Sequence, residues 1–191
     1  MLLLLAWHFP DARVDGVEAQ ALSVDLARRS IAWNGADDRC DVRHGDLRDT
    51  ALLDALGRFD LVTGTPPYLA VGSAPESRRP QKGPCNFEHR GGIEAYCAAA
   101  ARTLADDGVF VACEQAAQDD RVRSAARDAG LHVARSTPVV PRDGKAALFA
   151  VHVLRRGAGT TCVRPPLVVR DACGVRTPAF AEVRAAMGLP P

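Results

Sequence analysis

The sequence predicts an α/β fold with a mostly parallel sheet. Segments of strand character alternate with segments of helical periodicity through the first 130 residues, which is the pattern of successive strand–helix units. The segments 131–136 and 147–154 then follow each other with only the turn 142–145 (RDGK) between them, which predicts an antiparallel hairpin at the end of the sheet. The length of 191 residues suits one domain that buries a sizeable core.

The first part of the chain predicts three helices and three strands. Apolar spacing and breaker residues place helices at 2–9, at 19–33 and from 49 or 50 to 56, and strands at 13–18, 40–44 and 59–63. The N-terminal run MLLLLAWHFP is interpreted as the end of a buried helix. It lacks the basic segment and the cleavage site of a signal peptide, and it is too short to span a membrane.

The second part of the chain opens with a long loop at 69–90, which is rich in proline, glycine and charge. Further segments are a helix at 93–105, a strand at 109–113, a helix at 119–129, an apolar run at 167–169 and a short helix at 179–187. We expect one domain over residues 1–156 and a C-terminal extension, residues 157–191, that packs on it.

The charge of the chain is unevenly distributed. Residues 1–120 carry 12 Lys/Arg and 19 Asp/Glu, a net charge of −7, whereas residues 121–191 carry 12 and 4, a net charge of +8. A basic C-terminal third indicates either an anionic partner such as nucleic acid or a scatter of solvated arginines. None of the six cysteines has metal-site spacing, so we expect reduced thiols in a cytoplasmic protein without a metal.

Two carboxylates follow predicted strands. Glu18 ends one strand and Asp46 lies just beyond the next, and ligands of open α/β sheets bind beyond the carboxyl ends of strands. Glu18 could accept the hydroxyls of a ribose, or be a solvated acid. Asp46 could accept a hydrogen bond from the amine of an adenine, or cap the turn before the next helix.

The segment FDLVTGTPPY, residues 59–68, carries the strongest signal. Pro66 and Pro67 hold the backbone extended and remove two N–H donors, which leaves a row of carbonyl acceptors at the end of a strand. Tyr68 then offers a flat ring on which a base can stack. Acceptors that orient the hydrogens of an amino group, beside a ring that holds its plane, favour a site for a reacting amine. The alternative is a proline-rich exit from the strand with Tyr68 as its cover.

The long loop that follows holds basic residues and one histidine. Arg78, Arg79, Lys82 and Arg90 are candidate phosphate contacts of a nucleic acid. His89 adjoins Glu88, but no nucleophile accompanies the pair, so we assign it no catalytic role. The sequence has no GxSxG, HExxH or GxxxxGK[ST] motif, which argues against the corresponding hydrolases, zinc proteases and nucleotidases.

The ordered segments resemble a known family. ARVDGVEAQ, HGDLRD, FDLVTGTPPY and GGIEAYCAAAARTLADDGVFVA resemble class I S-adenosylmethionine-dependent methyltransferases, and the pattern is similar to bacterial tRNA adenine-N6-methyltransferases with a small-methyltransferase domain. The resemblance covers most of residues 6–180. It implies a Rossmann-like methyltransferase sheet with an antiparallel last strand, S-adenosylmethionine as cofactor and RNA, most simply tRNA, as partner.

The resemblance also implies residue roles. Glu18 would hold the cofactor ribose, and Asp46 with the adjacent Leu47 the adenine. Thr65, Pro66 and Pro67 would orient the target amine, and Tyr68 would stack on the flipped base. The family has Asn or Asp where this chain has Thr65. Its first strand and Gly-rich loop find no counterpart here, so we expect a sheet that lacks that strand and a chain truncated at its N-terminus.

Two other functions remain open from the sequence. One is a binding protein that kept the sheet and lost the cofactor. The other is a methyltransferase that acts on a protein glutamine or on a small-molecule amine, because a turn of this kind serves those groups as well.

Overall fold

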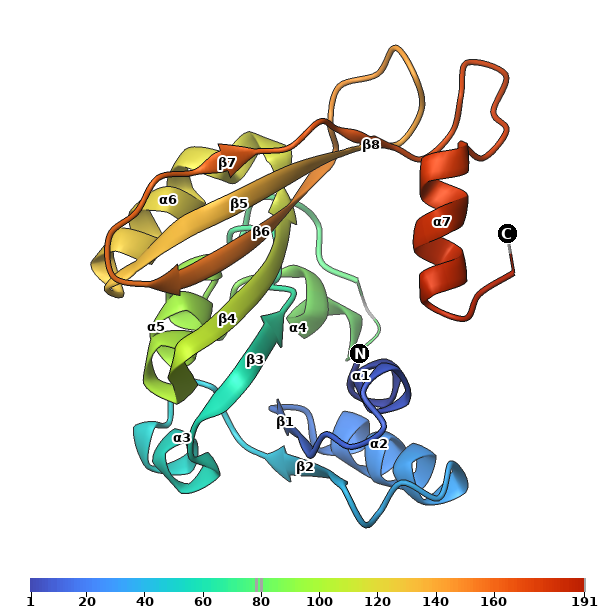
Figure 1. Cartoon of the computed structure of the whole chain (residues 1–191). Helices are drawn as coiled ribbons and strands as arrows, with labels where there is room; N and C mark the ends of the chain where they lie inside the picture. Colours follow the sequence, from blue (N-terminus) through green and yellow to red (C-terminus); the bar gives the residue numbers. More distant parts are fainter. Residues whose placement is uncertain (78, 80, 191) are drawn as a thin grey trace. The chain divides into compact units, whose positions relative to one another are not determined.

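The computed structural model of the chain describes residues 1–77, 79 and 81–190 (Figure 1). It divides into two compact units, Met1–Leu56 and Gly57–Pro191. Residues 157–190 belong to the second unit, and the expected domain division at residue 157 stays a prediction. No helix among the described residues is long and apolar enough to cross a membrane.

The first unit contains two parallel strands and three helices. Its elements are α1 (Leu2–His8), β1 (Val14–Glu18), α2 (Ala21–Trp33), β2 (Cys40–His44) and α3 (Thr50–Leu56). β1 pairs with β2 from Val14↔Cys40 to Glu18↔His44, and both helices α1 and α2 contribute to the core beneath them. The expectation that the N-terminal run is a buried helix is wrong in part: only Ala6 of α1 is buried, and Leu4, Trp7 and Phe9 are exposed.

The second unit is built on a six-stranded sheet in the order β3-β4-β6-β5-β7, with β8 also paired to β5. Its elements are β3 (Phe59–Gly64), α4 (Lys82–Asn86), α5 (Ile93–Thr103), β4 (Leu104–Gln115), η1 (Ala116–Gln118), α6 (Asp119–Asp128), β5 (Leu131–Val140), β6 (Phe149–Arg156), β7 (Cys162–Val163), β8 (Leu167–Val168) and α7 (Pro178–Ala186).

The direction of the strands sets where a site can form in this unit. β3 and β4 are parallel, and β6 is antiparallel to both β4 and β5. The carboxyl ends of β3, β4 and β5 therefore meet at one edge of the sheet, together with the start of β6. This edge is called the carboxyl edge below. The predicted antiparallel last hairpin is confirmed.

One face of this sheet is covered by α5 and α6 (Figure 1). The core there joins residues of both helices to residues on alternating positions of β4 and β6, including Ile93, Cys97, Phe110, Val122 and Leu154. The period of two along β4 is what brings every second side chain onto this face.

Within the described residues, β1 hydrogen-bonds only to β2 and β3 only to β4, so the strands form two sheets.

β4 differs from the sequence prediction. It begins at Leu104, not at residue 109, because Leu104 pairs with Phe59 and is fully buried. The register then shifts, and Leu61 pairs with Val109. Gly108 fits this irregularity because a Cβ there would lie 2.9 Å from the carbonyl oxygen of Phe59. The sequence ADDG resembles a helix stop, yet here it lies inside a strand.

Candidate active site

In the first unit Glu18 lies at the carboxyl ends of the two parallel strands β1 and β2. Glu18 is half-buried and lies opposite His44, and its backbone oxygen accepts a hydrogen bond from Gly45 N at 3.0 Å. Its side-chain Oε1 accepts from Gln20 N at 2.7 Å. One carboxylate oxygen thus fixes the orientation of the side chain, and the other stays available to a ligand.

Asp46 and Leu47 lie in the turn that leaves the same edge, and both are half-buried. Arg48 binds both carboxylate oxygens of Asp46, with Nε at 2.9 Å and Nη2 at 2.8 Å, and Arg48 N donates to the same carboxylate. The carboxylate raises the pKa of Arg48 through this hydrogen bond. Asp49, not Asp46, caps α3, because its Oδ1 accepts from Ala51 N and Leu52 N.

In the second unit the TPPY turn leaves β3 at the carboxyl edge. Thr65 is exposed, the Pro66 ring is fully buried, and Pro67 and Tyr68 are half-buried. Within the described part of the chain, no hydrogen bond is made to the backbone oxygens of Thr65, Pro66 or Pro67, or to the Thr65 hydroxyl. The turn is therefore anchored by one buried proline and keeps its acceptors for a ligand.

Tyr68 packs on the start of β6. Its ring centroid lies 5.5 Å from that of Phe149 with the planes at 41°, and its hydroxyl is 3.7 Å from Cys113 Sγ. Burial and the Cys113 contact raise the pKa of Tyr68, so the phenol stays protonated at neutral pH. Phe149 had no role in the sequence prediction, and only its register opposite Gln115 at the end of β4 brings it here.

The long loop predicted at 69–90 follows Tyr68, and its two ends are hydrogen-bonded to each other. Leu69 N donates to Asn86 O at 3.0 Å, and Glu88 N donates to Leu69 O at 2.9 Å, so the two ends meet. Phe87 is 2% exposed beneath this junction. The short helix α4 lies inside the loop, and its sequence KGPCN contains the two residues that most disfavour helices, which is why the sequence did not predict it.

Arg121 of α6 ties the end of this loop to the core. Its guanidinium binds Glu88 at 2.7 Å and Glu94 at 2.6 Å, and the hydrogen bonds to Arg121 lower the pKa of Glu94. His89 Nε2 lies 3.0 Å from a carboxylate oxygen of Glu76 within the loop, and the absence of a catalytic role for His89 stays a prediction. These partners lie too far apart in sequence for any local pattern to reveal them.

The candidate phosphate contacts lie on the same loop. Arg79, Lys82 and Arg90 are exposed, and Arg78 lies outside the described residues. Their proposed contact with nucleic acid stays a prediction.

Two buried titratable side chains share the face of the sheet beneath α6. Glu114 is 1% exposed and His152 is fully buried. Among the described residues Glu114 Oε2 and both ring nitrogens of His152 have no hydrogen-bond partner, and His152 Nδ1 lies 3.8 Å from Asp119 Oδ1. His152 lies opposite Ala112, two residues before Glu114, so the two side chains are diagonal neighbours. Burial raises the pKa of Glu114 and lowers that of His152, so both groups favour their neutral forms. Every second residue in the second half of β4 is buried on this face, as Phe110 and Ala112 are. This period of two is the sequence signal that could have predicted the burial of Glu114.

Replacing Glu114 by Gln is expected to raise the melting temperature at pH 7.5 by a few degrees. Because burial raises the pKa of Glu114 in the folded state, ionisation of this carboxyl costs stability as the pH rises above the ordinary carboxyl range. Gln cannot ionise, so the variant avoids this loss of stability. At pH 4 both proteins should melt alike. The exposed Glu182→Gln variant is the control, and thermal melts at both pH values are the measurement. An equal gain at pH 4 would contradict the explanation.

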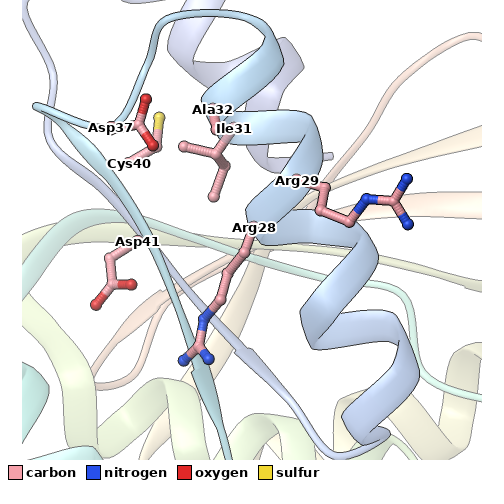
Figure 2. Close-up of a pocket in the computed structure, with 7 residues that line it drawn as sticks. All are labelled: Arg28, Arg29, Ile31, Ala32, Asp37, Cys40 and Asp41. Carbon is pink, nitrogen blue, oxygen red and sulfur yellow. The ribbon is translucent and has the colours of Figure 1, made fainter.

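A cavity of about 470 Å³ lies in the first unit, away from these residues (Figure 2). Its lining comes from α2 and from the approach to β2: Arg28, Arg29, Ile31, Ala32, Asp37, Cys40 and Asp41. It opens at the start of β2, whereas Glu18 and Asp46 lie at the opposite, carboxyl edge. It therefore contains no residue of the predicted cofactor site. Among the described residues no group of His, Cys, Asp or Glu could hold a metal ion.

No protein-family model matches the chain. The tRNA1(Val) (adenine(37)-N6)-methyltransferase of Porphyromonas gingivalis is 36% identical over 80 residues, which are 40% of this chain and 31% of that protein. The enzyme of the same name from Aeromonas hydrophila is 27% identical over 184 residues, 95% and 74% of the two chains. The ribosomal protein uL3 glutamine methyltransferase of Bradyrhizobium diazoefficiens is 36% identical over 88 residues, 43% and 26%.

Solved structures agree on the fold. A predicted O-methyltransferase of Agrobacterium tumefaciens has a TM-score of 0.72 at 18% identity and covers 97% of this chain and 83% of its own. An O-methyltransferase from neocarzinostatin biosynthesis, solved in complex with S-adenosylmethionine, has a TM-score of 0.51 at 14% identity, with 81% and 45% covered. The chain has the class I fold of S-adenosylmethionine-dependent methyltransferases.

Within that class, the sequence is similar to methyltransferases named for adenine N6 and for glutamine, which confirms the resemblance predicted from the sequence. The chain spans about a third of the length of the Porphyromonas gingivalis relative.

Proposed function

We propose that the chain transfers a methyl group from S-adenosylmethionine to an amino group, namely N6 of an adenine in tRNA or another RNA. The observation that carries this proposal is the TPPY turn at the carboxyl end of β3. Its backbone oxygens are unbonded within the described residues, and the Tyr68 ring follows at once. Acceptors without partners beside an aromatic ring fit a planar group that carries N–H donors.

The chemistry follows from what these residues can hold. S-adenosylmethionine supplies an electrophilic methyl group on a sulfonium. The Thr65 hydroxyl and the Pro66 carbonyl would accept the two hydrogens of the amine, which aims the nitrogen lone pair out of their plane. Tyr68 would stack on the base and fix that plane. Positioning alone is a large source of rate enhancement, and the proton leaves to water only after the new N–C bond has formed.

Glu18 and Asp46 are the residues that we propose for the cofactor. Glu18 keeps one oxygen for ribose hydroxyls while the other is held by Gln20 N. Asp46 is held by Arg48 through both carboxylate oxygens, so an adenine amine would share or replace that pairing. Leu47 would offer an apolar side to the same ring. The donor chemistry of these residues therefore fits a nucleoside.

The first test is cofactor binding by calorimetry with the full chain. We expect S-adenosylmethionine to bind, and Glu18→Gln to weaken binding about tenfold, since Gln keeps an oxygen for Gln20 N but removes the charge and an acceptor for the ribose. Asp25→Asn, on an exposed face of α2, is the matched control. Absence of heat at high cofactor concentration would instead support the alternative of a cofactor-free binding protein.

The second test identifies the acceptor. The chain is incubated with methyl-labelled S-adenosylmethionine and unfractionated tRNA, the RNA is digested, and N6-methyladenosine is sought by mass spectrometry. A glutamine-containing peptide is the parallel substrate, because the relative named as a glutamine methyltransferase favours protein glutamine as a second candidate. Adenine N6 and the glutamine amide both present an NH₂ group conjugated to a π system. Small aromatic amines form a third arm.

RNA is favoured over a peptide by the charge of the second unit, where residues 121–191 carry a net charge of +8. The six free cysteines fit a reducing compartment. We therefore place the proposed reaction in the cytoplasm.

A further inference from the structure

Two basic loops meet at the carboxyl edge of the second unit. One consists of residues 141–146 of the loop between β5 and β6, and the other of residues 170–176 of the loop between β8 and α7. Both lie at the end of the sheet beyond the β8 label (Figure 1). We call them together the two-loop platform. Neither loop belongs to the segment 69–90 to which the sequence assigned nucleic-acid contacts.

Backbone hydrogen bonds hold the two loops together. Asp143 N donates to Arg170 O at 2.8 Å. The second loop closes on itself through an Arg170↔Arg176 bridge, and Asp171 N donates to Val175 O at 2.8 Å. The Arg142 guanidinium lies against Gly174, where a Cβ would come within 3.1 Å of Nη2. The platform is thus one built surface, assembled from segments about 30 residues apart.

The basic side chains of the platform are exposed, and its two carboxylates accept hydrogen bonds from the backbone. Arg142, Lys145, Arg170 and Arg176 are all exposed. Within the described residues Arg142, Lys145 and Arg170 form no ion pair. The carboxylate of Asp143 accepts from Gly144 N, and that of Asp171 accepts from Val175 N. One oxygen of each carboxylate is thus held by the backbone, and Arg170 Nη1 donates to Gly174 O at 2.7 Å.

The platform connects directly to the TPPY turn. Leu148 N donates to Val139 O at 2.9 Å at the base of the first loop, and Phe149 follows at the start of β6. The Phe149 ring in turn packs on the ring of Tyr68. One short path of contacts therefore runs from Arg142 and Lys145 to the aromatic side chain proposed to stack on the target base.

We propose that the two-loop platform binds the phosphate backbone of the RNA whose base enters the TPPY turn. Exposed arginines and lysines that project from a rigid backbone suit phosphate contacts, which position a nucleic acid without reading its sequence. This inference rests on the proposed RNA substrate. It adds a second contact surface, on other residues, that would hold the strand on either side of the flipped base.

The test is the salt dependence of RNA binding, measured by fluorescence anisotropy with labelled unfractionated tRNA and no cofactor. The test variant is Arg142→Ala/Lys145→Ala, because it removes no side-chain hydrogen bond among the described residues. The matched control is Arg127→Ala/Arg155→Ala, which removes the same charge from the end of α6 and from the opposite edge of the sheet. Thermal melts of both variants establish that they are folded.

We expect the platform variant to bind tRNA about tenfold more weakly and to flatten the slope of log K against log salt by about 1.5–2, as for two lost phosphate contacts. The control should stay within about twofold of the wild type. Equal losses in both variants, or no loss in the platform variant, would overturn the proposal. So would binding of vesicles rich in anionic lipid in place of tRNA.

Different experimental results would contradict this proposal and the proposed function. If the wild type makes N6-methyladenosine and the platform variant binds tRNA like the wild type, the platform is overturned and the function stands. If no RNA is methylated but the platform variant alone loses tRNA binding, the platform stands and the methylation proposal falls.

Discussion

Replacing Tyr68 by Ala is expected to lower methyl transfer to RNA about 10- to 100-fold, whereas Tyr68→Phe should stay within about threefold of the wild type. Stacking of a base on an aromatic ring contributes about 1–3 kcal/mol, and both Tyr and Phe supply the ring. The Tyr68 hydroxyl makes only a 3.7 Å contact with Cys113 Sγ, so its loss should matter little. The measurement is single-turnover methylation with KM and kcat determined separately.

Two controls separate this role from a structural one. Val71→Ala changes an exposed side chain three residues further along and should leave the rate unchanged. Phe149 is not substituted in any of these variants. Thermal melts report whether loss of the contact between the Tyr68 and Phe149 rings unfolds the protein. If Tyr68→Phe were as slow as Tyr68→Ala, the hydroxyl rather than the ring would be the functional group, and the stacking role would be wrong.

Replacing Gly64 by Ala is expected to destabilise the protein by about 1–3 kcal/mol and to lower activity through displacement of the adjacent Thr65. A Cβ at Gly64 would lie 2.5 Å from Cδ1 and 2.9 Å from Cε1 of Tyr96 on α5, closer than atoms can approach. Either the aromatic ring or the end of β3 must move. Thermal melts, for which 1 kcal/mol corresponds to about 2–4 °C in a chain of this size, provide the measurement.

A double-mutant cycle tests the cause. In the background of Tyr96→Ala the ring atoms are gone, so adding Gly64→Ala should cost little further stability. A cost that stays the same in both backgrounds would show that the two positions are not coupled, and the clash would not be the reason. The stability changes of the two substitutions would then be additive, as they are for distant sites.

Local sequence predicted most elements well because their signals are local. β2 and α3 have the predicted bounds Cys40–His44 and Thr50–Leu56, since breaker residues flank each of them. The hairpin of β5 and β6 followed from the turn between two apolar runs. β4 was placed too late because Asp106 and Asp107 are exposed within an irregular pairing that only the neighbouring strand β3 defines.

The candidate site was predicted in part. The turn Thr65–Tyr68 and the placement of Glu18 at the end of its strand could be read from residue types and order. The partners of those residues could not: Phe149 lies 81 positions after Tyr68, and the register of β6 against β4 alone brings them into contact. Likewise, the sequence does not reveal that Arg48 binds both carboxylate oxygens of Asp46.

The sequence by itself determined the order of helices and strands, the antiparallel last hairpin and the rigid row of acceptors at Thr65–Pro67. These depend on backbone chemistry within a few residues, above all on two prolines that fix φ and lack N–H groups. Only the tertiary structure decided that Arg121 joins Glu88 to Glu94, that Glu114 is buried without a full set of partners, and that residues 143 and 170 bind each other. Those are pairings between distant segments, which depend on how the sheet is ordered and which local periodicity does not encode.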